Sequence, residues 1–245
     1  MIASKLLSLG VAVLVGAGAA SAQQLRYMPF GDSITEIVCW RAKLWQRLRT
    51  TEWGGGAVDW VGSGRGENNC GDTEYDRDNE GHSGFLAINI ANQRQLVGWL
   101  QRNPADVITM HLGTNDITQN RAVNDIIAAF TTLVGDMRAS NPRMKIIVAQ
   151  IIPISFGNLN GPIQNLNRAI VPWAQGLNTT ESPIWVVDQY TGFNTGSDLR
   201  DGVHPSNSGD EKMANVWYPA IVRAFEMAKA DRLAQLAAPD IPSAA

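Results

Sequence analysis

A serine and an aspartate–histidine pair are the side chains of this sequence best suited to chemistry. Ser33 follows Gly31-Asp32 directly after an apolar run, and Asp201 precedes His204 by three residues across a glycine. A carboxylate at that spacing can meet the imidazole, fix its tautomer and stabilise its protonated form. Ser33 is therefore a candidate nucleophile, and Asp201 and His204 are a candidate acid–base pair.

The small number of histidines narrows the search for a general base. The chain has three, and His is the side chain that most easily serves as a base near neutral pH. His111 lies inside a predicted strand, where packing or a hydrogen bond is its expected role. His82 has Glu80 close by but no carboxylate at the spacing found before His204. His204 is the best candidate.

Two further motifs could donate hydrogen bonds to developing negative charge. Gly84, in the run 81–85, could leave its backbone N–H accessible at the start of a helix. Asn115, in Gly113-Thr114-Asn115-Asp116, could point its amide at a substrate oxygen. Each motif also has a plain structural interpretation, a tight turn at Gly84 and an Asx-type turn at Asn115.

Asp32 and Asp116 adjoin these candidates and could organise their loops. Ser33 is expected at the start of a helical segment, where free backbone N–H groups favour negative charge and so suit a reaction that forms an oxyanion. A helix N-cap is the competing interpretation of Asp32 and Ser33, because these residue types commonly cap helices. Asp116 is equally open to a capping role.

The elements that must position these side chains alternate between strand-like runs and helical periodicity. Strands are predicted at 25–30, 58–61, 107–112, 145–151 and 184–187, and helices around 41–49, 86–100, 126–137, 163–173 and 213–224, with Pro172 expected to kink or shorten its helix. This alternation predicts an α/β fold with a central parallel sheet covered on both faces. Ligands of such sheets bind beyond the carboxyl ends of the strands, where the candidate residues fall.

We expect one domain at 23–235, preceded by a secretory signal and followed by a flexible tail at 236–245. Residues 1–22 have a single charge, an apolar run and a small-x-small cleavage motif at Ala20-Ser21-Ala22. That run is too short and too rich in Ala and Gly to span a bilayer. The polar stretch 62–81 is expected to be a long loop. The protein is therefore predicted to be secreted.

Secretion into an oxidising compartment changes the interpretation of Cys39 and Cys70, the only two cysteines. Two cysteines in a secreted chain most often pair, so a Cys39–Cys70 disulfide is expected. A thiol nucleophile is the weaker alternative, because neither lies in a Cys/His arrangement. Asn178-Thr179-Thr180 is the one sequon and could carry a single N-glycan.

Composition excludes several classes of protein. A net charge of −3 over 245 residues argues against a protein that binds nucleic acid, and 44% hydrophobic residues argue against a disordered chain. No Gly-x-Ser-x-Gly elbow and no phosphate-binding glycine loop occurs. No cofactor or metal is expected, although acidic loop residues could hold a structural calcium, namely Asp72, Asp76 and Asp78.

Taken together, the motifs resemble those of the SGNH, or GDSL, hydrolases. The matching blocks come in the family's order: Gly31-Asp32-Ser33-Ile34, Gly84, Gly113-x-Asn115-Asp116 and Asp201-x-x-His204. The resemblance is closest to carbohydrate esterase family 3, the acetylxylan esterases, and spans roughly residues 25–228. It rests also on the runs 28–36, 59–63, 80–85 and 201–205.

The resemblance implies a flavodoxin-like three-layer α/β/α sandwich and a catalytic triad of Ser33, His204 and Asp201. It further implies an oxyanion hole built from the backbone N–H groups of Ser33 and Gly84 and the side chain of Asn115. The implied enzyme is a secreted serine esterase that deacetylates plant polysaccharide. Its expected partner is acetylated xylan or xylo-oligosaccharide, with no nucleic acid and no membrane, and we expect a monomer.

Other functions stay open at this stage. A lipase, an arylesterase or an acetylesterase for another glycan would use the same residues, and a carbohydrate-binding domain could keep the fold without catalysis. Four tryptophans could reach a sugar-binding surface, namely Trp40, Trp45, Trp53 and Trp173. Two others, Trp99 and Trp217, are expected in the core.

Overall fold

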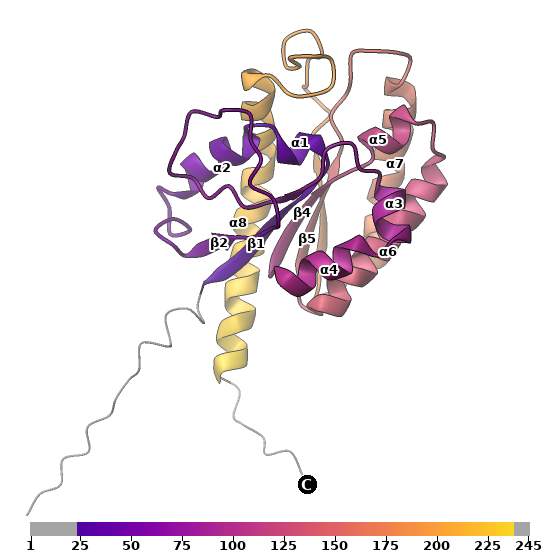
Figure 1. Cartoon of the computed structure of the whole chain (residues 1–245). Helices are drawn as coiled ribbons and strands as arrows, with labels where there is room; N and C mark the ends of the chain where they lie inside the picture. Colours follow the sequence, from indigo (N-terminus) through magenta and orange to yellow (C-terminus); the bar gives the residue numbers. More distant parts are fainter. Residues whose placement is uncertain (1–23, 238–245) are drawn as a thin grey trace, which may run out of the picture.

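The computed structural model describes residues 24–237 and contains a central β-sheet flanked by helices (Figure 1). The strands are β1 (Leu25–Gly31), β2 (Val58–Trp60), β3 (Glu80–Gly81), β4 (Val107–His111), β5 (Lys145–Gln150) and β6 (Ile184–Asp188). The helices are α1 (Ser33–Glu36), α2 (Trp40–Leu48), α3 (Ala87–Asn92), α4 (Gln95–Arg102), α5 (Thr114–Thr118), α6 (Val123–Ser140), α7 (Asn160–Leu177) and α8 (Asn207–Ala237). Signal residues 1–22 lie outside the described part.

All strand pairs in the sheet are parallel. The order is β2-β1-β4-β5-β6, and the short strand β3 pairs with the carboxyl end of β1. In register, Phe30 of β1 is opposite Met110 of β4, and Ile108 of β4 is opposite Ile146 of β5. The predicted α/β class with a central parallel sheet is confirmed.

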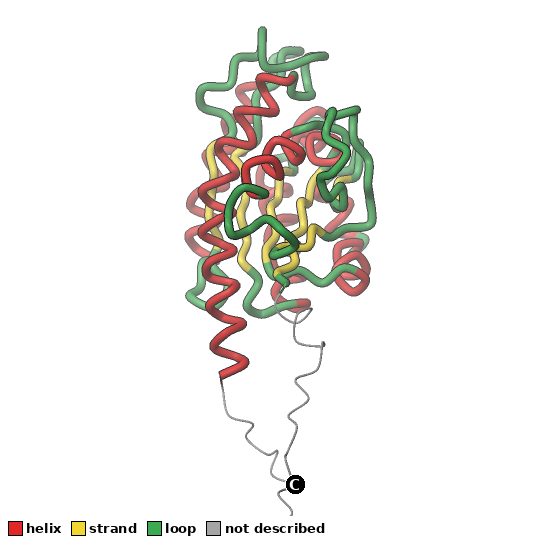
Figure 2. Tube along the Cα trace, turned by 90° about the vertical axis from the view of Figure 1, so that its left-hand side faces the viewer, coloured by secondary structure: helices red, strands yellow, loops and turns green. Residues whose placement is uncertain are grey.

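Two separate cores pack the two faces of the sheet. Helices α3, α4, α6 and α7 cover the face that carries Met28, Ile108 and Val148. Helices α1, α2 and α8 cover the opposite face, which carries Tyr27 and Ile147. Figures 1 and 2 show the resulting three layers, with α8 running the whole height of the sheet. The alternation of side chains along each strand produces this division, because successive residues point to opposite faces.

Glycines allow the chain to turn sharply where strands meet the carboxyl edge. A Cβ atom on Gly31 would lie 2.6 Å from the carbonyl oxygen of His111 and 2.2 Å from the hydroxyl of Thr35. Gly113, directly after β4, has a φ of +114°, a conformation that side chains disfavour. Both positions let the loops after β1 and β4 approach each other closely.

The structure differs from the predicted elements in five places, of which the first is α5 at Thr114–Thr118, a helix that was not predicted. The predicted helix 86–100 is two helices, α3 and α4, because Arg94 adopts a left-handed conformation between them. The predicted loop 62–81 ends in β3. Pro172 does not end α7, which continues to Leu177. Helix α8 continues to Ala237, beyond the start of the predicted tail.

The disulfide between Cys39 and Cys70 is present, as predicted, with the two Cα atoms 5.3 Å apart. It joins the start of α2 to the long loop before β3 across a separation of 31 residues. In the chain-entropy model, closing such a loop stabilises the folded state by about 3 kcal/mol. Among residues 24–237, no helix combines the length and the apolar character that crossing a membrane requires.

Candidate active site

Three candidate residues meet at the carboxyl edge of the sheet, although two of them are far from the third in the sequence. The hydroxyl of Ser33 lies 2.8 Å from Nε2 of His204, across 171 residues of chain. Nδ1 of His204 lies 2.7 Å from Oδ2 of Asp201. The three side chains therefore form one continuous line of hydrogen bonds, with the imidazole in the middle.

The loop before α8 holds Asp201 in the charged form. Its Oδ1 accepts hydrogen bonds from the backbone N–H groups of Val203, at 3.0 Å, and His204, at 2.8 Å. Partial burial works to raise the pKa of Asp201, but the bonds from the His204 backbone, the His204 ring and Val203 outweigh it and lower the pKa to about 2. Gly202, with a φ of +89°, makes this tight return possible.

Ser33 sits at the first position of α1, and Asp32 is the N-cap of that helix. Oδ1 of Asp32 accepts from the backbone N–H of Ile34 at 2.9 Å. The capping interpretation of Asp32 is therefore correct, and it does not compete with a catalytic one, because capping aims the Ser33 side chain at His204. The backbone N–H of Ser33 is one of the donors that a helix start leaves without an intrahelical partner.

Burial changes the acid–base behaviour of Asp32. Its side chain is fully buried, and this burial raises its pKa to about 7, with the nearby Asp116 acting in the same direction and the Ile34 N–H bond opposing it. Oδ2 of Asp32 faces the side-chain amide of Asn115 at 3.4 Å. A buried carboxyl with a raised pKa therefore adjoins the nucleophile.

Gly84 has a φ of +80° and lies in a loop that is tied to α1. Oε2 of Glu36, the last residue of α1, accepts from both the backbone N–H of Ser83, at 2.7 Å, and the Ser83 hydroxyl. Within residues 24–237, no described acceptor takes a hydrogen bond from the N–H of Gly84. The role of Glu36 was not predicted, since nothing in its spacing indicates a contact with residue 83.

Asn115 lies at the start of α5, directly after the turn at Gly113. Its Nδ2 donates to the carbonyl oxygen of Phe85 at 3.0 Å and faces Asp32 at the longer distance given above. The shorter bond fixes the amide beside the loop that contains Gly84. The longer contact to Asp32 lies beyond the usual hydrogen-bond range, so it is the weaker of the two contacts of the amide.

Asp116 caps α3 from the neighbouring helix α5. Its two carboxylate oxygens accept from the backbone N–H of Ala87, at 2.8 Å, and of Ile88, at 3.2 Å. Burial raises the pKa of Asp116 against the effect of these bonds. Asp116 thus has both of the roles considered for it, since capping α3 also fixes the loop that precedes it.

The other two histidines have structural partners. His111 is fully buried and its Nε2 accepts from the backbone N–H of Ile152 at 3.3 Å, while burial lowers its pKa to about 3. Nε2 of His82 lies 2.7 Å from Glu80, the carboxylate that is also close to it in the sequence. Glu80 is bound in turn by Ser63, so this pair is separate from Ser33.

The predicted tryptophan surface is partly wrong. Trp40 and Trp53 are buried in the core between the sheet, α2 and α8, so neither can stack on a substrate. Trp45 and Trp173 are half-buried, and Trp173 packs on Phe130 of α6. The core positions expected for Trp99 and Trp217 are confirmed.

The acidic residues of the long loop are engaged one by one. Asp72 bonds Gln46, Asp76 accepts from the backbone of Trp60, and Asp78 pairs with Arg65, so the three carboxylates have separate partners. In the part of the chain that the structure describes, no group of three or more His, Cys, Asp or Glu side chains is placed to hold a metal ion.

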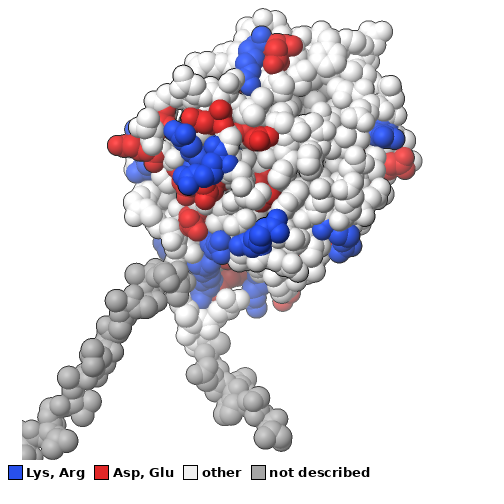
Figure 3. Space-filling view, viewed as in Figure 1, with Lys and Arg blue, Asp and Glu red and all other residues white. Residues whose placement is uncertain are grey.

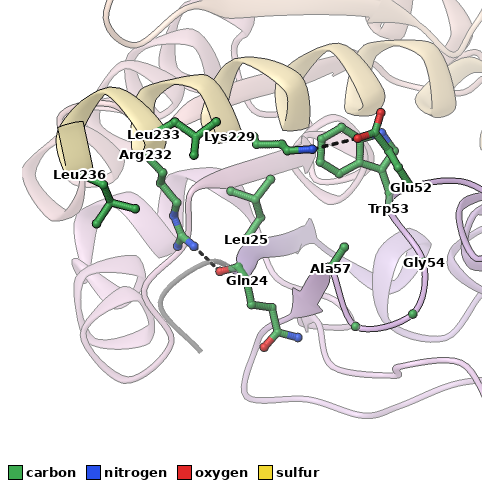
Figure 4. Close-up of a pocket in the computed structure, with 12 residues that line it drawn as sticks. Gln24, Leu25, Glu52, Trp53, Gly54, Ala57, Lys229, Arg232, Leu233 and Leu236 are labelled. Atoms are coloured by element: carbon green, nitrogen blue, oxygen red, sulfur yellow. Dashed lines mark hydrogen bonds and ion pairs between the residues drawn. The ribbon is translucent and has the colours of Figure 1, made fainter. Parts of the chain in front are cut away.

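A sizeable hollow lies at the opposite edge of the sheet from these residues. It has a volume of about 410 Å³ and lies between the start of β1, the loop 52–57 and the end of α8 (Figure 4). A second hollow, of about 300 Å³, has Arg200, Pro205 and both disulfide cysteines among its walls. Viewed from the front, charged side chains gather to the left and below, and few lie along the top (Figure 3).

Comparison with known proteins identifies the class of enzyme. The model of the GDSL-like Lipase/Acylhydrolase family matches residues 30–212. A carbohydrate esterase family 3 structure from Talaromyces cellulolyticus is 38% identical, with a TM-score of 0.78, and the match covers 83% of this chain and 99% of that one. An acetyl esterase mutant with acetate ion matches with the same values.

Two bacterial proteins are more distant. A family 3 carbohydrate esterase from Clostridium thermocellum is 27% identical, with a TM-score of 0.69 and a match over 83% of this chain and 98% of that one. A multidomain esterase of Ruminococcus flavefaciens is 27% identical over 82% of this chain, which spans 29% of that longer protein.

The parallel α/β sandwich and the residues at its carboxyl edge define an ester hydrolase. The chain belongs to the GDSL-like lipase/acylhydrolase family, and its relatives of 38% identity are carbohydrate esterases of family 3 and acetyl esterases. The family resemblance inferred from the motifs is confirmed.

Proposed function

We propose that the protein is a secreted serine esterase that removes acetyl groups from plant polysaccharide, most specifically from acetylated xylan. The observation that carries the proposal is the aligned pair of contacts Ser33–His204 and His204–Asp201, at 2.8 and 2.7 Å. A serine, an imidazole and a carboxylate in this order are the parts of an acyl-transfer centre.

The first half-reaction forms an acetyl-enzyme. The Ser33 oxygen attacks the ester carbonyl while its proton moves to Nε2 of His204, and Asp201 stabilises the resulting imidazolium through Nδ1. The tetrahedral intermediate then collapses: the bond to the sugar oxygen breaks, and His204 returns the proton to that oxygen. The low pKa of Asp201 keeps its charge in place throughout.

Water completes the cycle. His204 takes a proton from water, the hydroxide oxygen attacks the acetyl carbonyl, and the bond to Ser33 breaks with return of the proton to the serine oxygen. Acetate leaves and the free enzyme is restored. In both half-reactions, negative charge on the carbonyl oxygen is met by the N–H groups of Ser33 and Gly84 and by Asn115, which are donors directed at developing charge.

Substrate class and location rest on different evidence. Acetyl specificity and a carbohydrate substrate are supported by the acetyl esterase and family 3 carbohydrate esterase relatives. Secretion is supported by the apolar N-terminal segment and by the Cys39–Cys70 disulfide, since disulfides persist in oxidising compartments.

The sequon lies where a glycan can be accepted. Asn178 is exposed at the end of α7, and its Oδ1 accepts from Ile184 at 2.9 Å, which leaves the amide nitrogen directed away from that bond. Glycosylation at Asn178 remains a prediction for a host that glycosylates.

Acetate release from acetylated xylan, measured beside a series of p-nitrophenyl esters of increasing acyl length, tests the proposal. We expect acetate from xylan and the highest kcat/KM on the acetyl ester. Activity that rises with acyl length would reject the acetyl assignment in favour of a lipase or arylesterase. Binding of xylan without turnover would indicate a carbohydrate-binding domain.

The nucleophile is tested separately. Ser33→Ala should abolish release of acetate from every substrate in the series, because no other hydroxyl lies within reach of His204 in the described residues. Full activity in this variant would reject the mechanism even if the substrate assignment were right.

A further inference from the structure

A residue with a partly exposed aromatic ring adjoins the proposed oxyanion donors through its backbone. Phe85 follows Gly84, and its carbonyl oxygen holds the amide of Asn115 at 3.0 Å. Its side chain is nevertheless 37% exposed, although burial of a phenylalanine is normally favourable. Among the residues described, the other large apolar side chains this exposed are Phe156, Leu233 and Leu236.

A stack of rings supports Phe85 from behind. Its ring packs on the ring of His82, with centroids 5.0 Å apart and planes 26° apart, and His82 packs in turn on Trp99, at 4.1 Å and 17°. Because His82 covers one face of Phe85, the exposed area belongs to the opposite face and the edge.

Buried polar contacts fix the orientation of the stack. Nε2 of His82 bonds the fully buried Glu80, and Glu80 is bound by the backbone N–H and the hydroxyl of Ser63. His82 thus lies between Trp99 and Phe85 in a single orientation. The outer ring is held rigid before any ligand arrives, which lowers the entropy cost of binding.

We propose that Phe85 is a stacking platform for a pyranose ring of the substrate, placed directly beside the oxyanion hole. This inference rests on the proposed action on an acetylated polysaccharide. A flat, rigid, half-exposed aromatic face complements the apolar C–H face of a sugar ring, while the polar rim of the sugar stays in water. It gives His82 and Glu80 a function, since together they position the platform rather than take part in acyl transfer.

The position next to Gly84 assigns the platform to one part of the substrate. A sugar ring on Phe85 lies next to the donors that receive the carbonyl oxygen, so binding of the ring brings its acetyl ester to Ser33. The platform therefore strengthens the binding of substrates that carry sugar rings and adds little to the binding of esters of simple alcohols.

Comparison of Phe85→Ala with Phe85→Tyr on two substrates tests this proposal. Acetylated xylo-oligosaccharide and p-nitrophenyl acetate share the acetyl group and differ in the alcohol. We expect the ratio of kcat/KM on the oligosaccharide to kcat/KM on p-nitrophenyl acetate to fall about 3- to 10-fold in Phe85→Ala, through KM. Phe85→Tyr, which keeps the ring, should retain the ratio. Leu233→Ala, at the far end of α8, is the control for loss of exposed apolar area.

Each alternative outcome overturns the proposal. An unchanged ratio in Phe85→Ala shows that the ring does not contact the sugar, and an equal loss on both substrates shows a general effect on the site. A gain in kcat/KM on p-nitrophenyl butyrate shows that Phe85 is instead a wall of the acyl pocket. If wild-type protein releases no acetate from the oligosaccharide, the proposed function fails rather than the platform.

Discussion

The ion pairs at the amino edge of the sheet contrast with the buried Asp32 at its carboxyl edge, although that edge also holds the Lys212–Asp198 ion pair at 2.6 Å. At the amino edge, charges are paired: Nζ of Lys145 lies 2.6 Å from Asp231, and Arg232 lies 2.6 Å from Asp106. At the carboxyl edge, the buried Asp32 has N–H partners and a raised pKa, and no basic side chain among residues 24–237 forms an ion pair with it.

This difference separates the parts of the molecule that stabilise it from the part that reacts. The ion pairs join α8 to the first residues of β5 and to the chain before β4, and so close the amino edge. At the other edge, Asp32 is retained although its burial opposes ionisation, because it caps α1 and so aims Ser33. We therefore expect changes at His204 and Asn115 to alter turnover, and changes at the amino-edge ion pairs or at the buried Asp32 carboxyl to alter stability.

The largest expected effect is that of His204→Ala. Removing the base should lower kcat on p-nitrophenyl acetate about a million-fold. The free energy of unfolding should change by less than about 1 kcal/mol, because within residues 24–237 the hydrogen-bond partners of the ring are Ser33 and Asp201. Steady-state kinetics and urea unfolding measure the two quantities. A loss of activity below tenfold would show that another group is the base.

Asp32→Asn should change how stability depends on pH. In the unfolded chain the carboxyl ionises near pH 4, and in the folded protein near pH 7. Between these values the folded state keeps a proton that the unfolded state has lost, so the free energy of unfolding falls as pH rises, by about 4 kcal/mol in total.

Asn keeps the capping oxygen but cannot ionise, so its unfolding curve should lack this fall. Urea unfolding of both proteins at pH 4, 5.5 and 7 measures the difference, which should grow with pH in favour of the variant. Asp210 also has a raised pKa, but it is present in both proteins, so its effect on the free energy of unfolding cancels in the difference between them. A difference that is constant over the window would contradict the buried, protonated Asp32.

Asn115→Ala should lower kcat about 100- to 1000-fold with little change in KM, because the amide acts on charge that is present mainly in the transition state. Asn115→Asp is the matched variant, since it keeps the shape but replaces the donor with an acceptor. An Asp variant as active as wild type would show that Asn115 is not part of the oxyanion hole. Steady-state kinetics on p-nitrophenyl acetate measure kcat and KM for both variants.

The smallest effect is expected at the amino edge. Asp231→Ala leaves the buried Lys145 with the carbonyl oxygen of Glu181 as its partner. Because Asp231 is 31% exposed, the loss should be about 2 kcal/mol, below that of a fully buried pair. The midpoint temperature of thermal unfolding should fall by about 4–8 °C, and kcat per folded molecule should not change. The double variant Lys145→Met, Asp231→Leu should recover most of the stability.

The candidate site was predictable where its geometry is local. The bonds from His204 to Asp201 span three residues, and the capping of Ile34 by Asp32 spans two, so spacing alone indicates them. Alternation of apolar residues was sufficient for the sheet, because each buried strand must present one residue to each core.

The remaining features depend on contacts between distant residues. Glu36 reaches Ser83 across 47 positions, and the stack of Phe85, His82 and Trp99 forms only once Trp99 of α4 has packed on His82. Helical periodicity also cannot detect a single left-handed residue, so Arg94 divided a helix that the pattern predicted as continuous. Trp53 could not be distinguished from an exposed tryptophan by its neighbours in the chain.

The length of chain between Ser33 and His204 also determines when the enzyme can first act. The two residues are 171 positions apart, and His204 lies in the loop just before α8, the last helix. At about 5–20 residues per second, a ribosome needs about 10–30 s to make the base after the nucleophile. Throughout that interval the growing chain holds a serine without its histidine, and it is therefore inert toward any ester that it meets.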